Sequence, residues 1–347
     1  MQIIAELKFK KIRQIGVGQG LNSKVYLAHD PQLNTDLAVK EIDKTTFWNP
    51  KWFEEAQTVY SVAHPNVVSV QYGCELGNQA FVAMPFYASG SLADRLQAGP
   101  VSLFEISRLG QGILQGLAHI HSSGYVHLDL KPSNVLFDDI GRPLVADFGQ
   151  ARALGPAGIV KAPPLYRKSL PPEVLSTGHA VVQSDIYQIG ILLYRAVNGE
   201  ESFSTQLARF RTDTDFCSAV AREKFPDRQA FLPHVPKPLR TLIRKALRSN
   251  PLERFDSATS LADALGRIHM KKDWSVEIDS SGEMKWSTAA GCPTPLSVEL
   301  RNSRGGWGTE VYTNGTTVRA RGRGELWRLC PSRSEALNHL KRVFEQL

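Results

Sequence analysis

Cysteine is scarce in this chain of 347 residues, which has only Cys74, Cys217, Cys292 and Cys330. These four form no CxxC pair and show no paired spacing, which argues against a disulfide framework and predicts reduced thiols in a cytoplasmic protein. Long apolar runs are also missing, since the most apolar run, Ile186–Val197, is short and contains Arg195. That run predicts a buried helix and no membrane span. The N-terminus has no apolar stretch, so we expect no signal peptide.

A strong charge imbalance, an internal repeat and a low-complexity segment are absent too. Lys and Arg number 41 and Asp and Glu 34, which gives a formal net charge of +7. This surplus permits an acidic partner, including nucleic acid, but it more often serves solubility. With 42% hydrophobic residues, the chain can bury a large core, and its length exceeds that of one typical domain.

The most informative feature that is present is the segment His127–Asn134, followed by Asp147-Phe148-Gly149. It supplies Asp129, Lys131 and Asn134 at short spacing, then a second carboxylate 18 residues after the first. Phosphoryl transfer from ATP needs a base for the substrate hydroxyl, cations near the migrating charge and oxygen ligands for Mg²⁺. Both motifs, in this order and separation, resemble the catalytic loop and metal-binding motif of eukaryotic-like serine/threonine protein kinases of bacterial type.

That resemblance implies a role for each polar residue of the loop. Asp129 would be the catalytic base, and Lys131 would neutralise charge on the γ-phosphate. Asn134 and Asp147 would be the metal ligands that hold Mg²⁺. Leu128 departs from the family, because an arginine that meets an activation-loop phosphate normally stands there. A conventional phosphorylation switch is therefore not expected.

The resemblance covers residues 9–270 and implies an ATP site built mainly from the first part of the chain. The glycine-rich loop departs from the family spacing, with Ser23 in place of the third glycine and two extra residues before it. Lys40 matches the lysine that holds the α- and β-phosphates, and of two candidate glutamates, Glu54 and Glu55, we choose Glu55 as its partner. The residues expected to bind ATP are Ile15, Gly16, Gly18, Ser23, Val25, Ala38, Lys40, Glu55, Met84, Phe86, Asn134 and Asp147.

The segment Asp147–Glu173 would be the activation segment. Its hydroxyls Tyr166 and Ser169 offer little to phosphorylate. By the same resemblance, Glu173 would form a structural ion pair with Arg254, and Asp185 would stand near the start of a buried central helix.

The pattern of elements predicts an α+β fold with two lobes, a β-rich one followed by a helical one. Residues 104–121 predict an amphipathic helix with one apolar stripe, made of Ile106, Leu109, Ile113, Leu117 and Ile120. Composition changes near Lys271, and four of the six tryptophans lie beyond that point. We therefore divide the chain into a kinase domain, 9–270, and a small α+β accessory domain, 272–347.

We recognise no family resemblance in the accessory domain. Short strands are expected at 274–278, 284–287, 296–301 and 325–330, and residues 310–318 predict a hairpin with an Asn-Gly turn. Ser332 and Glu335 form a capping box that opens a final amphipathic helix. A tryptophan-centred sheet with this helix packed on it is favoured over a nucleic-acid surface built from its arginines and tryptophans.

The sequence therefore predicts a protein kinase that transfers the γ-phosphate of ATP, with Mg²⁺, to serine and threonine hydroxyls of an unidentified protein substrate. A pseudokinase scaffold that binds nucleotide and a small-molecule phosphotransferase are the alternatives. No membrane partner is expected, and a nucleic-acid partner is the less favoured possibility.

Overall fold

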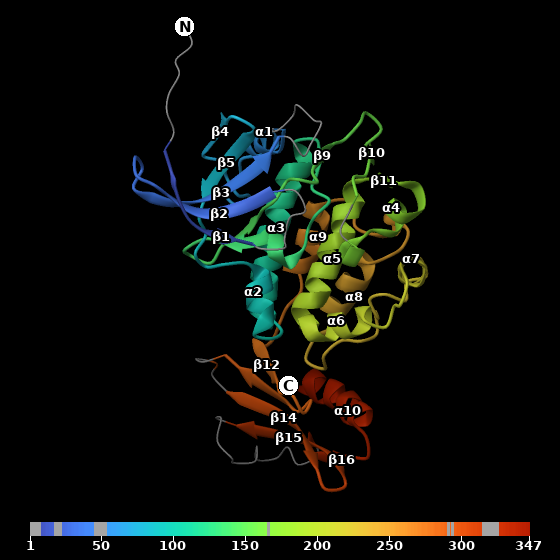
Figure 1. Cartoon of the computed structure of the whole chain (residues 1–347). Helices are drawn as coiled ribbons and strands as arrows, with labels where there is room; N and C mark the ends of the chain where they lie inside the picture. Colours follow the sequence, from blue (N-terminus) through green and yellow to red (C-terminus); the bar gives the residue numbers. More distant parts are fainter. Residues whose placement is uncertain are drawn as a thin grey trace.

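The computed structural model of the chain describes residues 8–16, 23–44, 54–164, 167–289, 292, 295–313 and 326–347. A β-rich lobe, a helical lobe and a C-terminal sheet with one helix follow one another along the chain (Figure 1). The predicted α+β, two-lobed fold is confirmed. The four cysteines are free, and no helix in the described part of the chain is long and apolar enough to cross a membrane.

The β-rich lobe is a five-stranded antiparallel sheet with one helix. Its strands lie in the order β1-β2-β3-β5-β4, and the bounds are β1 (Lys10–Ile15), β2 (Ser23–Asp30), β3 (Thr35–Asp43), β4 (Tyr72–Leu76), β5 (Gln79–Pro85) and α1 (Glu54–Ser61).

Side chains alternate between the two faces of this sheet, because successive residues of a strand point in opposite directions. One face holds a small apolar core of Ala28, Leu37, Val39, Phe81 and Ala83. On the other face the register forms a row in which Ile15 pairs with Val25 and Val25 pairs with Lys40. Ala38 pairs with Met84 on that same face. The side chains predicted to bind ATP therefore share the face opposite the core.

The second lobe is mainly helical. Its helices are α2 (Leu92–Gln97), α3 (Leu103–Ser122), α4 (Pro172–Thr177), α5 (Val182–Asn198), α6 (Glu200–Leu207), α7 (Asp213–Ala221), α8 (Lys237–Ala246) and α9 (Ala258–Gly266), with 3₁₀ turns η1 (Pro132–Asn134), η2 (Arg167–Ser169) and η3 (Pro251–Glu253). Three two-stranded ladders pair β6 (Tyr125–Val126) with β9 (Arg152–Ala153), β7 (Val135–Phe137) with β8 (Pro143–Val145), and β10 (Val160–Lys161) with β11 (His179–Ala180).

Helices α3 and α5 form the centre of this lobe. The five apolar residues of the predicted α3 stripe are at most 2% exposed, which confirms that prediction. Gly116 allows a close approach, since a Cβ there would lie 2.5 Å from the carbonyl oxygen of Asn66. Asn66 in turn accepts a hydrogen bond from the Val145 amide and donates one to the carbonyl of Pro143, both 2.8 Å long. Strand β8, which leads into Asp147, is thereby fixed against α3.

The C-terminal unit is an antiparallel sheet in the order β12-β13-β14-β15-β16 with α10 packed on it. Its elements are β12 (Trp274–Ile278), β13 (Met284–Thr288), β14 (Leu296–Ser303), β15 (Gly306–Thr313), β16 (Arg328–Cys330) and α10 (Arg333–Gln346). The side chain of Ser332 accepts a hydrogen bond from the Glu335 amide at the start of α10. The predicted Asn-Gly turn lies outside the described residues.

The buried face of this sheet continues the core of the helical lobe. Trp286 of β13 is fully buried, and its Nε1 donates to Nδ1 of His234, 2.9 Å away in the loop before α8. The ring of Phe344 on α10 lies 5.0 Å from Trp274 and 5.4 Å from Trp286. The predicted boundary near Lys271 is therefore not a break in packing, and the division into two domains stays a prediction.

Candidate active site

Asp185, the fourth residue of α5, anchors the catalytic loop. One carboxylate oxygen of this fully buried residue accepts from the Leu128 amide at 2.7 Å. The other accepts from the His127 amide at 2.8 Å and from Nε2 of His121 at 2.7 Å. Burial alone would raise the pKa of Asp185, but these donors, led by His121, lower it. A buried, ionised and fully hydrogen-bonded carboxylate thus fixes the start of the loop.

One turn further along α5, Gln188 fixes the next part of the loop. Its carbonyl oxygen accepts from the Leu130 amide at 2.9 Å, and its amide nitrogen donates to the Leu128 carbonyl at 2.8 Å. Leu128 has φ of +65°, a backbone conformation that is unfavourable for a branched residue. The contacts to α5 hold it there, so the loop geometry is set by a helix that is remote in sequence.

His127 links the loop to the segment that carries Asp147. Its Nδ1 accepts from the Asp129 amide at 3.3 Å, so its Nε2 carries the proton that is donated to the Ala146 carbonyl at 3.2 Å. The His127 ring also meets Phe148 edge-on at 4.9 Å. Asp147 itself has φ of +64°. The second carboxylate is therefore held beside the first in a specific backbone conformation.

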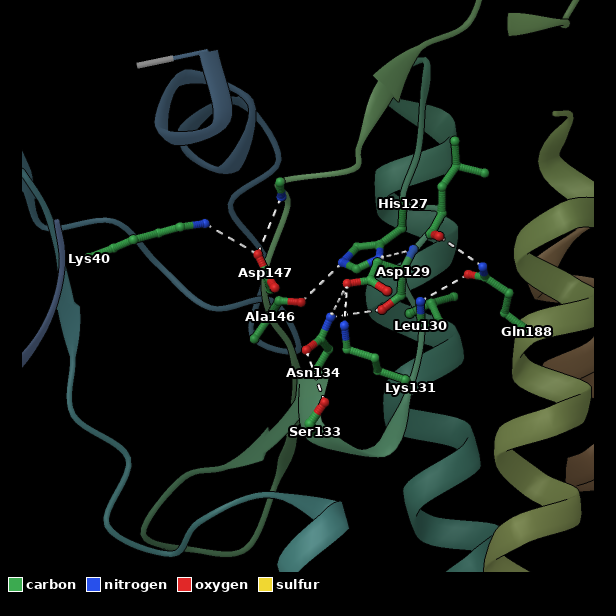
Figure 2. Close-up of polar contacts among 12 residues, drawn as sticks. Lys40, His127, Asp129, Leu130, Lys131, Ser133, Asn134, Ala146, Asp147 and Gln188 are labelled. Atoms are coloured by element: carbon green, nitrogen blue, oxygen red, sulfur yellow. Dashed lines mark hydrogen bonds and ion pairs between the residues drawn. The ribbon is translucent and has the colours of Figure 1, made fainter. Parts of the chain in front are cut away.

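The polar groups of the loop meet around the Asp129 carboxylate (Figure 2). Lys131 Nζ lies 2.7 Å from Asp129 Oδ2. The amide nitrogen of Asn134 donates to the same oxygen at 2.9 Å and to the Asp129 carbonyl at 2.8 Å. These bonds orient the Asn134 amide, because its nitrogen faces Asp129 and its oxygen must point elsewhere.

Lys40 reaches across from β3 to the same region, as Figure 2 shows. Its Nζ lies 3.4 Å from Oδ1 of Asp147, which also accepts from the Gly149 amide at 3.4 Å. This contact joins the two lobes at the site. The structure thus brings together Lys40, Asp129, Lys131, Asn134 and Asp147. Their roles in catalysis and metal binding stay a prediction.

The two carboxyl groups have opposite electrostatic environments. Burial raises the pKa of Asp129, although the Lys131 ammonium opposes the shift. Burial would also raise the pKa of Asp147, but the ammonium groups of Lys40 and then Lys131 outweigh burial and lower that pKa. Such a pair, with one carboxyl of increased proton affinity beside one held ionised, suits a base next to a cation ligand.

The structure describes most of the other residues that were predicted to bind ATP. Val25, Ala38 and Met84 are half-buried on the same sheet face as Lys40. Ile15 ends β1 in the row of Val25, Gly16 follows with φ of +62°, and Phe86 comes directly after β5. Gly18 and the side chains of Ser23 and Glu55 lie outside the described part of the chain. Their assignment to the ATP site stays a prediction.

The ion pair predicted at the end of the activation segment is present. Nη2 of Arg254 lies 2.6 Å from Oε2 of Glu173, and Nη1 lies 2.9 Å from Oε1. The same guanidinium donates to the carbonyls of Arg248 and Gln183 at 2.8 and 2.7 Å. The pair is bidentate, with Arg254 buried and the Glu173 side chain 11% exposed, and it ties α4 to the η3 turn.

Apolar packing surrounds Leu128, where the family has an arginine. Its buried side chain clusters with Val126 and Ala180, and residues of the activation segment, among them Leu154 and Val160, pack against this cluster. Ser169 is 2% exposed, so its hydroxyl is inaccessible in this conformation. The segment is therefore held by apolar contacts at the place where the family uses a charge pair.

Local sequence motifs do not reveal the positioning roles of Asp185, Gln188 and His127. Asp185 lies 58 residues beyond His127, and Gln188 lies 58 residues beyond Leu130. The resemblance placed Asp185 near the start of a buried helix but assigned it no partner, and Gln188 carried no signal.

Comparison with known proteins places this geometry in a family. Residues 9–264 match the model of the protein kinase domain. The serine/threonine-protein kinase PrkC of Bacillus subtilis (strain 168) is 30% identical over 262 residues, which are 73% of this chain and 39% of that protein. The probable serine/threonine-protein kinase PknB of Lactococcus lactis subsp. lactis (strain IL1403) is 28% identical over 290 residues, 80% of this chain and 43% of that protein. The chain spans about two fifths of the length of these relatives. The match extends over both lobes and the whole catalytic loop, and this chain belongs to the protein kinase domain family.

Proposed function

We propose that this chain transfers the γ-phosphoryl group of ATP to serine and threonine hydroxyls of proteins. The observation that carries the proposal is the convergence of Lys40, Asp129, Lys131, Asn134 and Asp147 through contacts of 2.7 to 3.4 Å. These are the groups that phosphoryl transfer needs, and catalysis of this reaction rests almost entirely on positioning and electrostatic stabilisation.

Asp129 is the group that would orient the attacking hydroxyl and accept its proton. The raised pKa of its carboxyl increases its proton affinity. Lys131, 2.7 Å from that carboxylate, would place its ammonium against the charge that develops on the transferred phosphate. Lys40 would hold the other phosphates of ATP from the opposite lobe.

The residues present fit a magnesium site. Asn134 donates through its nitrogen to Asp129. Its oxygen accepts from the Ser133 hydroxyl at 3.4 Å and keeps a second lone pair for a metal. Asp147 is a carboxylate whose pKa is lowered. Carboxylate and amide oxygens are ligands that Mg²⁺ accepts, and it usually takes one or two of them together with substrate phosphates. The bound Mg²⁺ would supply positive charge that offsets the negative charge of the phosphates. Asn134 and Asp147 are the proposed ligands.

The same geometry disfavours the two alternatives. A scaffold that only binds nucleotide does not need Asp129 and Lys131 held in contact. A small-molecule phosphotransferase does not need the segment before α4, which is anchored by Glu173 and Arg254 and resembles the part of protein kinases that receives a peptide.

The acceptor class is tested by incubating the full chain with labelled ATP, Mg²⁺ and a generic protein acceptor, followed by hydrolysis to amino acids. Label in phosphoserine and phosphothreonine is expected. Label confined to phosphotyrosine, or transfer to small molecules with none to protein, would contradict the proposal.

A further inference from the structure

The activation segment, Asp147–Glu173, carries charge of one sign between its two ends. Its carboxylates are the two terminal residues alone, and its cationic residues are Arg152, Lys161, Arg167 and Lys168. The chain as a whole is nearly balanced, with 41 cationic and 34 acidic residues, so overall composition does not explain this local excess. Both terminal carboxylates have a cationic partner outside the segment, Lys40 for the first and Arg254 for the second.

Apolar contacts hold the middle of this segment beside the proposed catalytic base. Val160 and Ala162 pack against the buried cluster around Leu128, the residue that directly precedes Asp129. Lys161 lies between them on β10, so its side chain points away from that cluster, and it is exposed. Figure 1 shows β10 and β11 at the end of the helical lobe that is farther from the C-terminal sheet. The backbone that carries this exposed ammonium is therefore held against the residue next to the base.

Lys168 lies on the η2 turn, which is fixed to the same support as the catalytic loop. The turn packs against α5, the helix that holds the loop through Asp185 and Gln188. Ser169, the last residue of the turn, is buried, and Lys168 itself is half-buried. Because the turn and the loop share one helix, the position of the turn is set relative to Asp129.

We propose that the protein acceptor carries carboxylates close to the hydroxyl that receives the phosphate, and that Lys161 and Lys168 contribute to the selection of such acceptors. This inference rests on the proposed function, because it concerns the acceptor of that same reaction. Opposite charges across a contact speed encounter and favour one class of partner, whereas a lysine-rich acceptor would be repelled. Both lysines keep contact with solvent, so each ion pair should change kcat/KM only roughly two- to fivefold, and selection comes from several pairs together.

The test measures kcat/KM of the full chain, with labelled ATP and Mg²⁺, for three peptides. Each peptide has one serine, which is flanked by four glutamates, four glutamines or four lysines. The glutamate peptide should exceed the glutamine peptide by at least about fivefold, and it should exceed the lysine peptide by more. The preference should shrink as ionic strength rises from about 0.05 to about 0.5 M, because salt screens pairs between exposed charges.

Charge reversal assigns the preference to the activation segment. The double variant Lys161→Glu/Lys168→Glu should lower the ratio of kcat/KM for the glutamate peptide over the lysine peptide by at least about tenfold. General damage to the fold would lower both values and leave the ratio unchanged. If the half-buried Lys168 does not tolerate glutamate, Lys161→Glu alone should still lower the ratio at least about twofold. Lys285→Glu is the matched control, since Lys285 is exposed on β13 of the C-terminal sheet, and its ratio should equal that of wild type.

Two results would overturn this inference and leave the proposed function standing. One is transfer to serine with equal kcat/KM for the glutamate and glutamine peptides, or with a preference for the lysine peptide. The other is a preference for glutamate that reversal of both lysines leaves unchanged. No transfer to any peptide or protein acceptor would instead overturn the proposed function, and this inference with it.

Discussion

Replacing Asp185 by asparagine preserves the shape of the side chain but removes the charge that anchors the catalytic loop. The carboxylate accepts three hydrogen bonds, from the His127 and Leu128 amides and from His121. Asparagine has only one acceptor oxygen. Its amide nitrogen is a donor and would face a backbone N–H, which is also a donor, so no hydrogen bond can form between them. One charge-assisted bond is lost and the other two become neutral.

The cost follows from these bonds. A hydrogen bond to a charged group contributes about 1.5–3 kcal/mol and a neutral one about 1, so the variant should lose roughly 3–5 kcal/mol of unfolding free energy. That is a large share of the roughly 5–15 kcal/mol of a typical domain. Where the protein still folds, displacement of the loop by about 1 Å should lower kcat on the order of 100-fold.

The assay is urea unfolding together with phosphoryl transfer, for wild type and Asp185→Asn. Asp263→Asn is the matched control, since Asp263 is exposed on α9, and a change within about 0.5 kcal/mol is expected there. The folded-state pKa of Asp185 is lowered. Its contribution is therefore complete above the unfolded pKa of about 4, and the difference from the variant should shrink as pH falls through the folded pKa. An unfolding midpoint and a kcat equal to those of wild type would refute the role of Asp185.

Four further predictions concern more distant features. Arg254→Met should destabilise the protein by about 3–5 kcal/mol in urea unfolding, because it leaves the largely buried Glu173 carboxylate without its charged partner; a neutral result would contradict this. Ser169→Ala should leave transfer activity and stability within about 0.5 kcal/mol, since the buried hydroxyl has no partner among the described residues; a large activity loss reversed by Ser169→Glu would show a conventional switch. Trp286→Phe should cost about 1–3 kcal/mol by leaving Nδ1 of His234 unpaired, which thermal unfolding would detect. Deletion of residues 272–347 should lower the melting temperature of the kinase lobes, because it uncovers part of their core; an unchanged melting temperature would show two independent units.

The sequence predicted the two lobes, and it placed three residues of the proposed site close together, for a physical reason. Asp129, Lys131 and Asn134 lie within six residues, so their spacing alone brings them together. The α3 stripe was readable because burial follows the helical period. Asp185 and Gln188 each form hydrogen bonds with loop residues that lie 58 positions earlier in the sequence, and no local sequence pattern predicts such a contact.

The surroundings of the tryptophans in residues 272–347 also depend on tertiary packing. The sequence predicted them as the core of a separate sheet, and Trp274 and Trp286 are indeed buried on one sheet face. The bond from Trp286 to His234 joins that face to the helical lobe and could not be inferred from composition.

The central claim is that Asp129 is the base of a phosphoryl-transfer reaction. The most direct test compares full-length wild type with Asp129→Asn, using labelled ATP, Mg²⁺ and a protein acceptor, with ATP affinity measured separately. The wild type should label itself or the acceptor. Asp129→Asn should bind ATP normally and transfer about 10²- to 10⁴-fold more slowly. Undiminished transfer by Asp129→Asn, or ATP binding by the wild type with no transfer to any protein, would contradict the account.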